Sequence, residues 1–131
     1  MYSEKVINLF ANAENVGILG SASAVGVYTN EKTNEVFKLY LKIENDKIID
    51  ASLKAYTGVV GVAIMSTFAE MLKDMTLENA GNITGRDILK EVGKIDKKFE
   101  YLANDVVESY KLAIEDYQEK LEKSAKKAKQ K

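Results

Sequence analysis

The chain has 131 residues, a length typical of one domain that buries a core without disulfide bonds. Hydrophobic residues make up 46%, charged residues 30%, and the net charge of −1 argues against a nucleic-acid or membrane-surface partner. No apolar run approaches the roughly 18 residues of a membrane span. The first ten residues lack an export-signal pattern, so a cytoplasmic location is expected.

Several residue types that carry chemistry are missing. The sequence has no cysteine, histidine, tryptophan or proline. Without cysteine there is no disulfide, no thiolate nucleophile and no soft metal ligand, and without histidine no side chain titrates near pH 7 at its usual pKa. Catalysis would have to use Asp, Glu, Lys, Tyr, Ser or Thr. Arg86 is the only arginine, which argues against bidentate phosphate clamps.

The N-terminal part predicts a helix, a loop and a strand. A helix is expected over residues 2–12, with Ser3 as its N-cap. Its apolar face consists of Val6, Leu9 and Phe10. Residues 15–24 are mostly small or polar and predict a loop, and residues 25–27 predict a short strand.

Two longer strands follow, each with clean alternation of apolar and polar residues. They are expected over residues 36–43 and 47–56, and the short turn at Asn45-Asp46 makes them antiparallel. The side chains expected in the core are Phe37, Leu39, Leu41 and Ile43 from the first strand, and Ile49, Ala51, Leu53 and Ala55 from the second. The polar side chains between them predict that the other face is exposed to solvent.

Helices make up the rest of the chain. Residues 58–73 are apolar almost all round and predict a buried helix, with Thr57 as its N-cap. Short helices are expected at residues 77–80 and 87–92, introduced by Thr76 and Thr84.

A long helix is expected at the C-terminus. Asp96 caps it, and it runs over about residues 97–123 because apolar residues recur at spacings of three and four. Residues 123–131 are rich in lysine and predict a frayed or disordered tail. Five lysines there could touch a phosphate backbone, but a solvated tail is the simpler interpretation. The chain therefore reads as one domain over residues 1–122, followed by this tail.

The element order is that of an α+β fold: a three-stranded antiparallel sheet packed on one side by helices, with a long C-terminal helix. The chain resembles the NifU/IscU family of iron–sulfur cluster assembly scaffold proteins. The resemblance covers nearly the whole chain, up to about Tyr117. It is close in Tyr2-Ser3-Glu4-Lys5-Val6, Asn15-Val16-Gly17, Lys38-Leu39-Tyr40-Leu41-Lys42, Thr76-Leu77-Glu78 and Ile114-Glu115-Asp116-Tyr117.

The resemblance implies that the cluster ligands have been lost. The family holds its nascent cluster with three cysteines and an aspartate. Counted without gaps from the matching segments, the cysteine positions fall on Thr33, Gly58 and Leu102, and the aspartate position on Glu35. Clusters need thiolate or imidazole ligands, so no metal or other cofactor is expected. Sulfur transfer onto a scaffold cysteine is likewise impossible, and residues 95–99 do not match the family's chaperone-docking motif.

Three functions remain open. The first is a non-catalytic, protein-binding relative of the scaffold, acting as an adaptor, regulator or structural subunit, or a divergent relative whose new role is unrelated to iron–sulfur assembly. The resemblance implies a cysteine desulfurase, an active scaffold or a client complex as its partner. The oligomeric state does not follow from the sequence.

The second is a small-molecule or hard-metal site in the old cluster pocket. That pocket would be lined by Glu35, Tyr56, Gly58 and Tyr101. Carboxylates of Glu35, Glu100 and Asp105 would suit Mg²⁺, Ca²⁺ or Mn²⁺. An anion could also dock at the helix N-terminus near Gly58.

The third is an enzyme. Its best grouping is Tyr101 beside Glu100, with Lys97 or Lys98 nearby. An ordinary solvated helix surface is the simpler interpretation of these residues, so catalysis is not expected.

Overall fold

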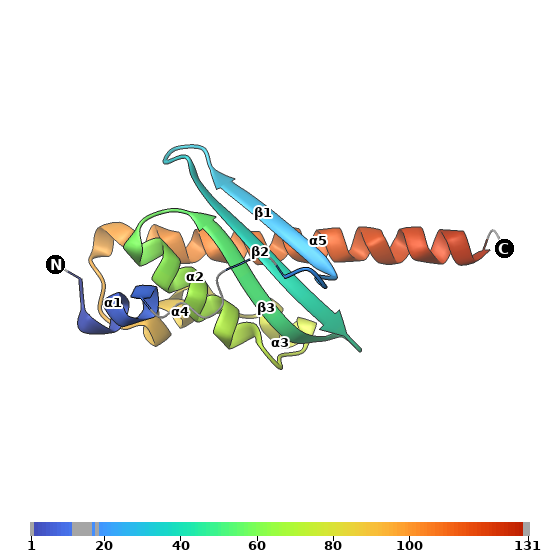
Figure 1. The fold of residues 1–131 in the computed structure, drawn as a ribbon, viewed down its shortest axis with the longest axis horizontal. Helices are drawn as coiled ribbons and strands as arrows, with labels where there is room; N and C mark the ends of the chain where they lie inside the picture. The colour runs from blue at the N-terminus through green and yellow to red at the C-terminus, as the bar shows by residue number, and fades with distance from the viewer. Residues whose placement is uncertain (1, 12–16, 18, 130–131) are drawn as a thin grey trace.

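The computed structural model describes residues 2–11, 17 and 19–129. Figure 1 shows the elements in chain order: α1 (Glu4–Ala11), β1 (Ala24–Asn30), β2 (Glu35–Glu44), β3 (Lys47–Tyr56), α2 (Val59–Leu72), α3 (Leu77–Gly81), α4 (Gly85–Val92), a 3-10 turn (Lys97–Phe99) and α5 (Tyr101–Lys129). The predicted α+β architecture is confirmed. Residues 15, 16 and 18 of the loop predicted at residues 15–24 lie outside the described residues, as do residues 1, 12–14 and 130–131.

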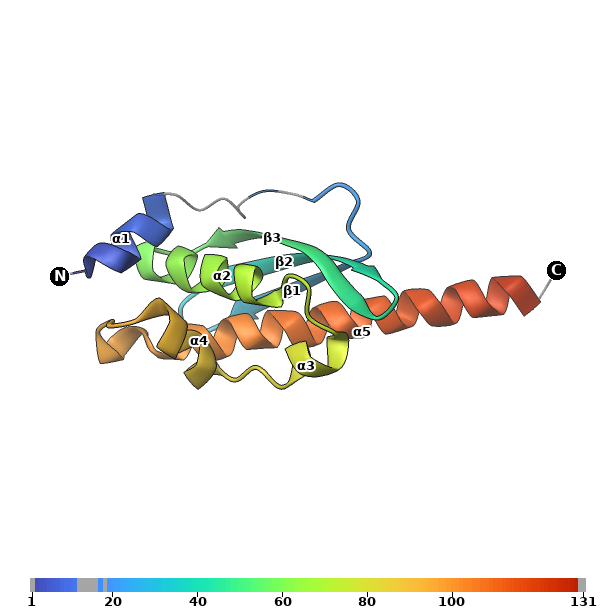
Figure 2. The same ribbon diagram turned by 90° about the horizontal axis from the view of Figure 1, so that it is seen from below.

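The molecule has two layers. The sheet has the order β1-β2-β3 and is antiparallel throughout. The long helices α2 and α5 pack against one face of it, and α3 and α4 flank α5 (Figure 2). Helix α2 buries ten of its 14 residues, which is why its sequence is apolar all round. Within the described residues, no helix combines the length and apolar character that a bilayer span demands.

The β2–β3 hairpin confirms the predicted turn but shifts the core face of β3. Asn45 and Asp46 have φ values of 53° and 58°, as a two-residue hairpin turn of the primed type requires. Ile43 pairs with Ile48, whereas Lys42 pairs with Asp50, so a bulge leaves Ile49 without a partner. The prediction that Ile49 faces the core was therefore wrong: Ile48 is fully buried and Ile49 is 36% exposed.

Strand β1 is longer than predicted and lies directly on α5. A Cβ at Gly26 would come within 2.0 Å of the carbonyl oxygen of Ser109, so only glycine allows this approach. The Asp116 carboxylate accepts a hydrogen bond of 2.9 Å from the N–H of Val25. These contacts fix the β1–β2 hairpin against the middle of α5.

Three predicted helix boundaries were wrong. Gly58, not Thr57, is the N-cap of α2, and no side chain caps that end. Asp96 caps the 3-10 turn, so α5 itself begins at Tyr101. It continues to Lys129, past the predicted end near Lys123, and its last turns project beyond the body of the molecule (Figures 1 and 2). Glutamates four residues before lysines support these turns.

Candidate functional site

Three chain segments meet at one end of the sheet. They are the start of β2, the β3–α2 junction and the start of α5. The two carboxylate oxygens of Glu35 accept hydrogen bonds from the Thr57 hydroxyl and the Tyr101 hydroxyl. These are the segments that the resemblance aligns with the cluster ligands, and here an oxygen network joins them. We call Glu35, Thr57 and Tyr101 the Glu35 network.

The β1–β2 hairpin aims Glu35 at the helices. The side chain of Asn30 accepts hydrogen bonds from the N–H groups of Lys32 and Thr33, at 3.0 and 3.3 Å. Asn34 takes a positive φ of 63°, which asparagine tolerates better than most residues. Glu35 then lies two residues before the fully buried Phe37, so alternation places both on the inner face.

The network fixes the protonation of its members. Burial alone would raise the pKa of Glu35, but hydrogen bonds from Thr57, Tyr101 and Thr33 outweigh it and hold that pKa below its usual value. The hydrogen bond to Glu35, together with burial, raises the pKa of Tyr101 to about 12. At neutral pH the carboxylate is therefore ionised, and the phenol keeps its proton and donates a hydrogen bond to Glu35.

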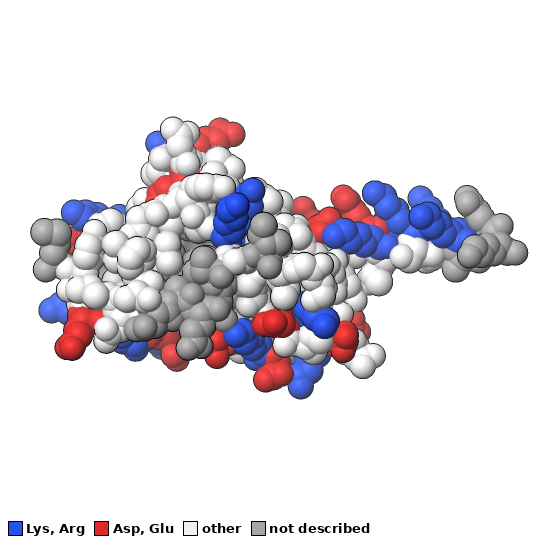
Figure 3. All heavy atoms as spheres, in the orientation of Figure 1, with Lys and Arg blue, Asp and Glu red and all other residues white. Residues whose placement is uncertain are grey.

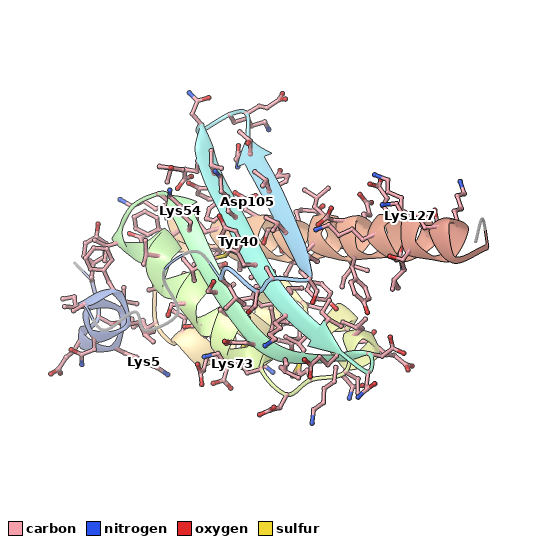
Figure 4. All side chains as sticks on the ribbon, turned by 45° about the vertical axis from the view of Figure 1, so that its right-hand side comes forward. Lys5, Tyr40, Lys54, Lys73, Asp105 and Lys127 are labelled. Atoms are coloured by element: carbon pink, nitrogen blue, oxygen red, sulfur yellow. The ribbon has the colours of Figure 1, made fainter. Side chains whose placement is uncertain are left out.

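A second carboxyl group lies one helical turn away. Asp105 (labelled in Figure 4) is 7% exposed and accepts a hydrogen bond of 2.9 Å from the side-chain amide of Asn30. Burial is the main cause that raises its pKa; the charges of Glu35 and Glu108 add to the effect, and the Asn30 hydrogen bond opposes it. The site thus holds two carboxyl groups whose pKa values move in opposite directions.

The predicted hard-metal ligands do not form a site. No three Asp or Glu side chains within the described ranges come close enough together to hold one metal ion, so the set of Glu35, Glu100 and Asp105 was wrong. Both oxygens of Glu35 already accept hydrogen bonds from within the chain. A small-molecule ligand for the old pocket stays a prediction.

The structure places the other predicted site residues in different surroundings. Thr33 accepts a hydrogen bond of 3.3 Å from the N–H of Glu35, and Leu102 is buried in the core, at 2% exposure. Tyr56 points to the outer face of the sheet and is 54% exposed, so the structure does not bring it to Glu35. Gly58 is the N-cap of α2. Tyr101 lines a hollow of about 520 Å³ whose other walls are Gly85, Arg86, Leu89, Lys90, Glu100 and Asn104.

Sequence reasoning placed a candidate site around residues 56–58 but gave Thr57 the role of an N-cap. Its position just before α2 predicts an N-cap, but its hydroxyl donates to Glu35 instead. Sequence reasoning missed the pairing of Asn30 with Asp105, which are 75 positions apart in sequence. Only the expectation that the β1–β2 hairpin approaches the last helix could have suggested this pair.

Comparisons with known proteins agree with this fold. The family model described as the NifU-like N terminal domain matches residues 1–124. The iron–sulfur cluster assembly scaffold protein IscU of Aquifex aeolicus is 33% identical over 118 residues, which cover 88% of this chain and 75% of the relative. IscU 1 of Archaeoglobus fulgidus is 30% identical over 117 residues, covering 89% and 76%. The solved structure of the N-terminal part of a NifU-like protein from Brucella abortus superposes with a TM-score of 0.65 at 18% identity, covering 91% of this chain and 95% of that one.

Proposed function

This chain belongs to the NifU-like N-terminal domain family, and from that membership we propose that it serves iron–sulfur cluster assembly in the cytoplasm by binding other proteins, without a cluster of its own. Its partner is a cysteine desulfurase, an active cysteine-bearing scaffold or a client complex. The relatives it matches are named as scaffolds for cluster assembly, and the present chain has no cysteine to act as one.

The observation that carries this proposal is the Glu35 network. It joins the three segments that would otherwise supply cluster ligands, and it does so with side chains of the chain itself. Hydrogen bonds to an ionised carboxylate are stronger than those between neutral groups. In a scaffold, the bound cluster would link these three segments. Here hydrogen bonds link them without a cluster, which supports a protein that keeps the shape of a scaffold and carries no cluster.

Exposed apolar side chains gather at the same end. Among the described residues, eight large hydrophobic side chains are classed as exposed, and five belong to α1 and its lead-in, the β3–α2 junction and the start of α5. They are Tyr2, Ile7, Phe10, Tyr56 and Tyr101. These elements lie together at the left of Figures 1 and 2. Exposed apolar side chains that cluster on one region favour a protein-binding surface.

We do not propose catalysis. A phenol with a pKa of about 12 keeps its proton at neutral pH, so Tyr101 is a poor general base. Its hydroxyl is also committed to Glu35 rather than to Glu100, the neighbour with which the sequence grouped it.

The test is a direct binding measurement. The purified chain is titrated calorimetrically with the cysteine desulfurase and with the cysteine-bearing scaffold of the native host. Saturable binding to one of them is expected. The double variant Ile7→Glu/Phe10→Glu should weaken it about tenfold or more, because it places charge in the apolar surface. Leu121→Glu, an equally exposed residue on the projecting part of α5, is the matched control and should bind normally. Binding to neither protein rules out both of these partners; a chain that is then isolated from its host without a client complex contradicts the proposal.

A further inference from the structure

The outer face of the sheet carries two lysines in the middle of uncharged residues. Three neighbouring cross-strand rows point outward: Val25, Tyr40 and Ser52; Val27, Lys38 and Lys54; Thr29, Val36 and Tyr56. Lys38 and Lys54 are the only charged residues among these nine. Figure 3, which views this face, shows a basic patch within a largely uncharged surface (Tyr40 and Lys54 are labelled in Figure 4).

The two lysines form a like-charge pair. They lie directly opposite each other on β2 and β3, an arrangement that destabilises a sheet. Neither has an ion-pair partner within the part of the chain that the structure describes. Both ammonium groups instead lie 5.9 Å from the centre of the Tyr56 ring. A ring face attracts a cation, but it carries no negative charge that would neutralise two of them.

The open part of this face is the part nearest the Glu35 network. The Ser52 hydroxyl donates a hydrogen bond of 2.8 Å to the carbonyl of Gly17, so Gly17 lies next to the first of the three rows. The other two rows contain the most open side chains, since Val27 is 46% and Tyr56 is 54% exposed. This basic surface is therefore continuous with the apolar end of the molecule through Tyr56.

We propose that a protein partner docks on this surface and places one or two carboxylate side chains between Lys38 and Lys54, against the ring of Tyr56. The inference rests on the proposed protein-binding function and names the chemistry of the partner: an acidic group surrounded by apolar residues. An incoming carboxylate relieves the repulsion between the lysines, and Val27 and Val36 pack against the partner's apolar residues.

Two other occupants fit less well. A second copy of this chain that used the same face across a two-fold axis would set lysines against lysines. A nucleic acid needs many phosphate contacts, whereas the three rows offer two lysines, no arginine and a chain with a net charge of −1.

The experiment measures binding of the host's cysteine desulfurase and its cysteine-bearing scaffold to three forms of the full chain. These are the natural chain, Lys38→Glu/Lys54→Glu, and Lys126→Glu/Lys127→Glu as a matched charge change on the exposed end of α5. We expect the first variant to bind about tenfold or more weakly and the second to bind as the natural chain does. Binding should also weaken at an ionic strength of about 1 M, where the screening length is about 3 Å.

The outcomes separate this inference from the proposed function. If the natural chain binds and Lys38→Glu/Lys54→Glu binds equally well, the inference is overturned and the proposed function stands. If neither protein binds, the desulfurase and the scaffold are ruled out as partners, and an NMR titration of the chain with a hexaglutamate peptide decides the inference. Saturable shifts at Lys38, Lys54 and Tyr56 that the double variant abolishes would support it. Absent shifts, or tighter binding of a single-stranded oligonucleotide at these residues, would overturn it.

Discussion

The two faces of the sheet differ in whether their charged side chains have partners within the chain. On the inner face, Glu35 accepts hydrogen bonds from Thr57 and Tyr101, and on the helix packed against that face Asp105 accepts one from Asn30. On the outer face, Lys38 and Lys54 face each other with no carboxylate partner within the described residues. The carboxyl groups on the inner side have hydrogen-bond partners within the chain, whereas the two lysines on the outer face remain available to a partner protein.

This difference separates what holds the fold together from what the fold offers to other molecules. A buried polar group without a hydrogen bond is costly, so the inner charges need partners in the chain itself. Water screens the outer lysines, so the fold tolerates them without a counter-charge. The inner network therefore explains the shape, and the outer pair indicates where an acidic partner binds.

The largest effect is expected where β1 contacts α5. Gly26→Ala should lower the free energy of unfolding by about 3 kcal/mol, because the added methyl group collides with the backbone of Ser109 and displaces the hairpin that aims Glu35. Gly20→Ala, where nothing lies within 4 Å of the new methyl group, is the control and should change stability little. Urea unfolding measures both. Equal stabilities would show that the hairpin is not seated on α5 as described.

Removing the carboxylate of the Glu35 network comes next. Glu35→Ala should cost about 1–2 kcal/mol, since a charge-assisted hydrogen bond is lost in a partly exposed site. It should also bring the pKa of Tyr101 down from about 12 toward 10.0, because the hydrogen bond and charge that raise it are gone. Spectrophotometric titration of the phenols measures this fall in the pKa of Tyr101 directly. Glu31→Ala, in the exposed hairpin loop, is the control and should leave the tyrosine titration unchanged.

The pH dependence of stability tests the opposite shifts of the two carboxyl groups. The lowered pKa of Glu35 means that its stabilisation is complete above the unfolded value of 4.5 and is lost as pH falls through the folded pKa. The raised pKa of Asp105 has the opposite sign: stability is gained as pH falls through that pKa toward 3.8. Asp105→Asn should therefore stabilise the protein at neutral pH, by less than about 1 kcal/mol, and lose that advantage in acid.

Thermal unfolding measured across the acid range gives the stability of each variant as a function of pH. A stability gain in Asp105→Asn that is the same at every pH would contradict a raised Asp105 pKa. Glu35→Gln should make the acid limb of the curve less steep, since one of the carboxyl groups with a lowered pKa no longer titrates.

The smallest effect is expected on the outer face. Lys54→Glu converts the like-charge pair into an opposite-charge pair and should stabilise the sheet by about 0.5 kcal/mol. Lys42→Glu faces Asp50 on the neighbouring strand, so it should have the opposite sign. Urea unfolding at low ionic strength compares them. A destabilised Lys54→Glu would mean that the lysines are held apart and do not repel.

The sequence predicted the fold well where one local rule decides the structure. Asn45-Asp46 predicted the hairpin, and alternation placed Phe37, Leu39 and Leu41 in the core. It failed at Ile49, since a bulge depends on how two strands match along their whole length and not on the composition of either.

The site was predictable in part. Counting from the matching segments led to Glu35 and Leu102, and periodicity correctly placed Leu102 in the core. Tyr101, 66 positions from Glu35, was predicted to line the same pocket, whereas the donor Thr57, 22 positions away, was not. The local rules for Thr57 predict a helix cap, and a contact between distant segments overrides them.

The most direct test of the account is native mass spectrometry of the full chain isolated from its host without oxygen. The account predicts a complex with another protein, from which the released chain emerges at its bare mass, with no iron or sulfide attached. A released chain that carries the mass of iron and sulfide, or a chain that is always recovered alone, would contradict it.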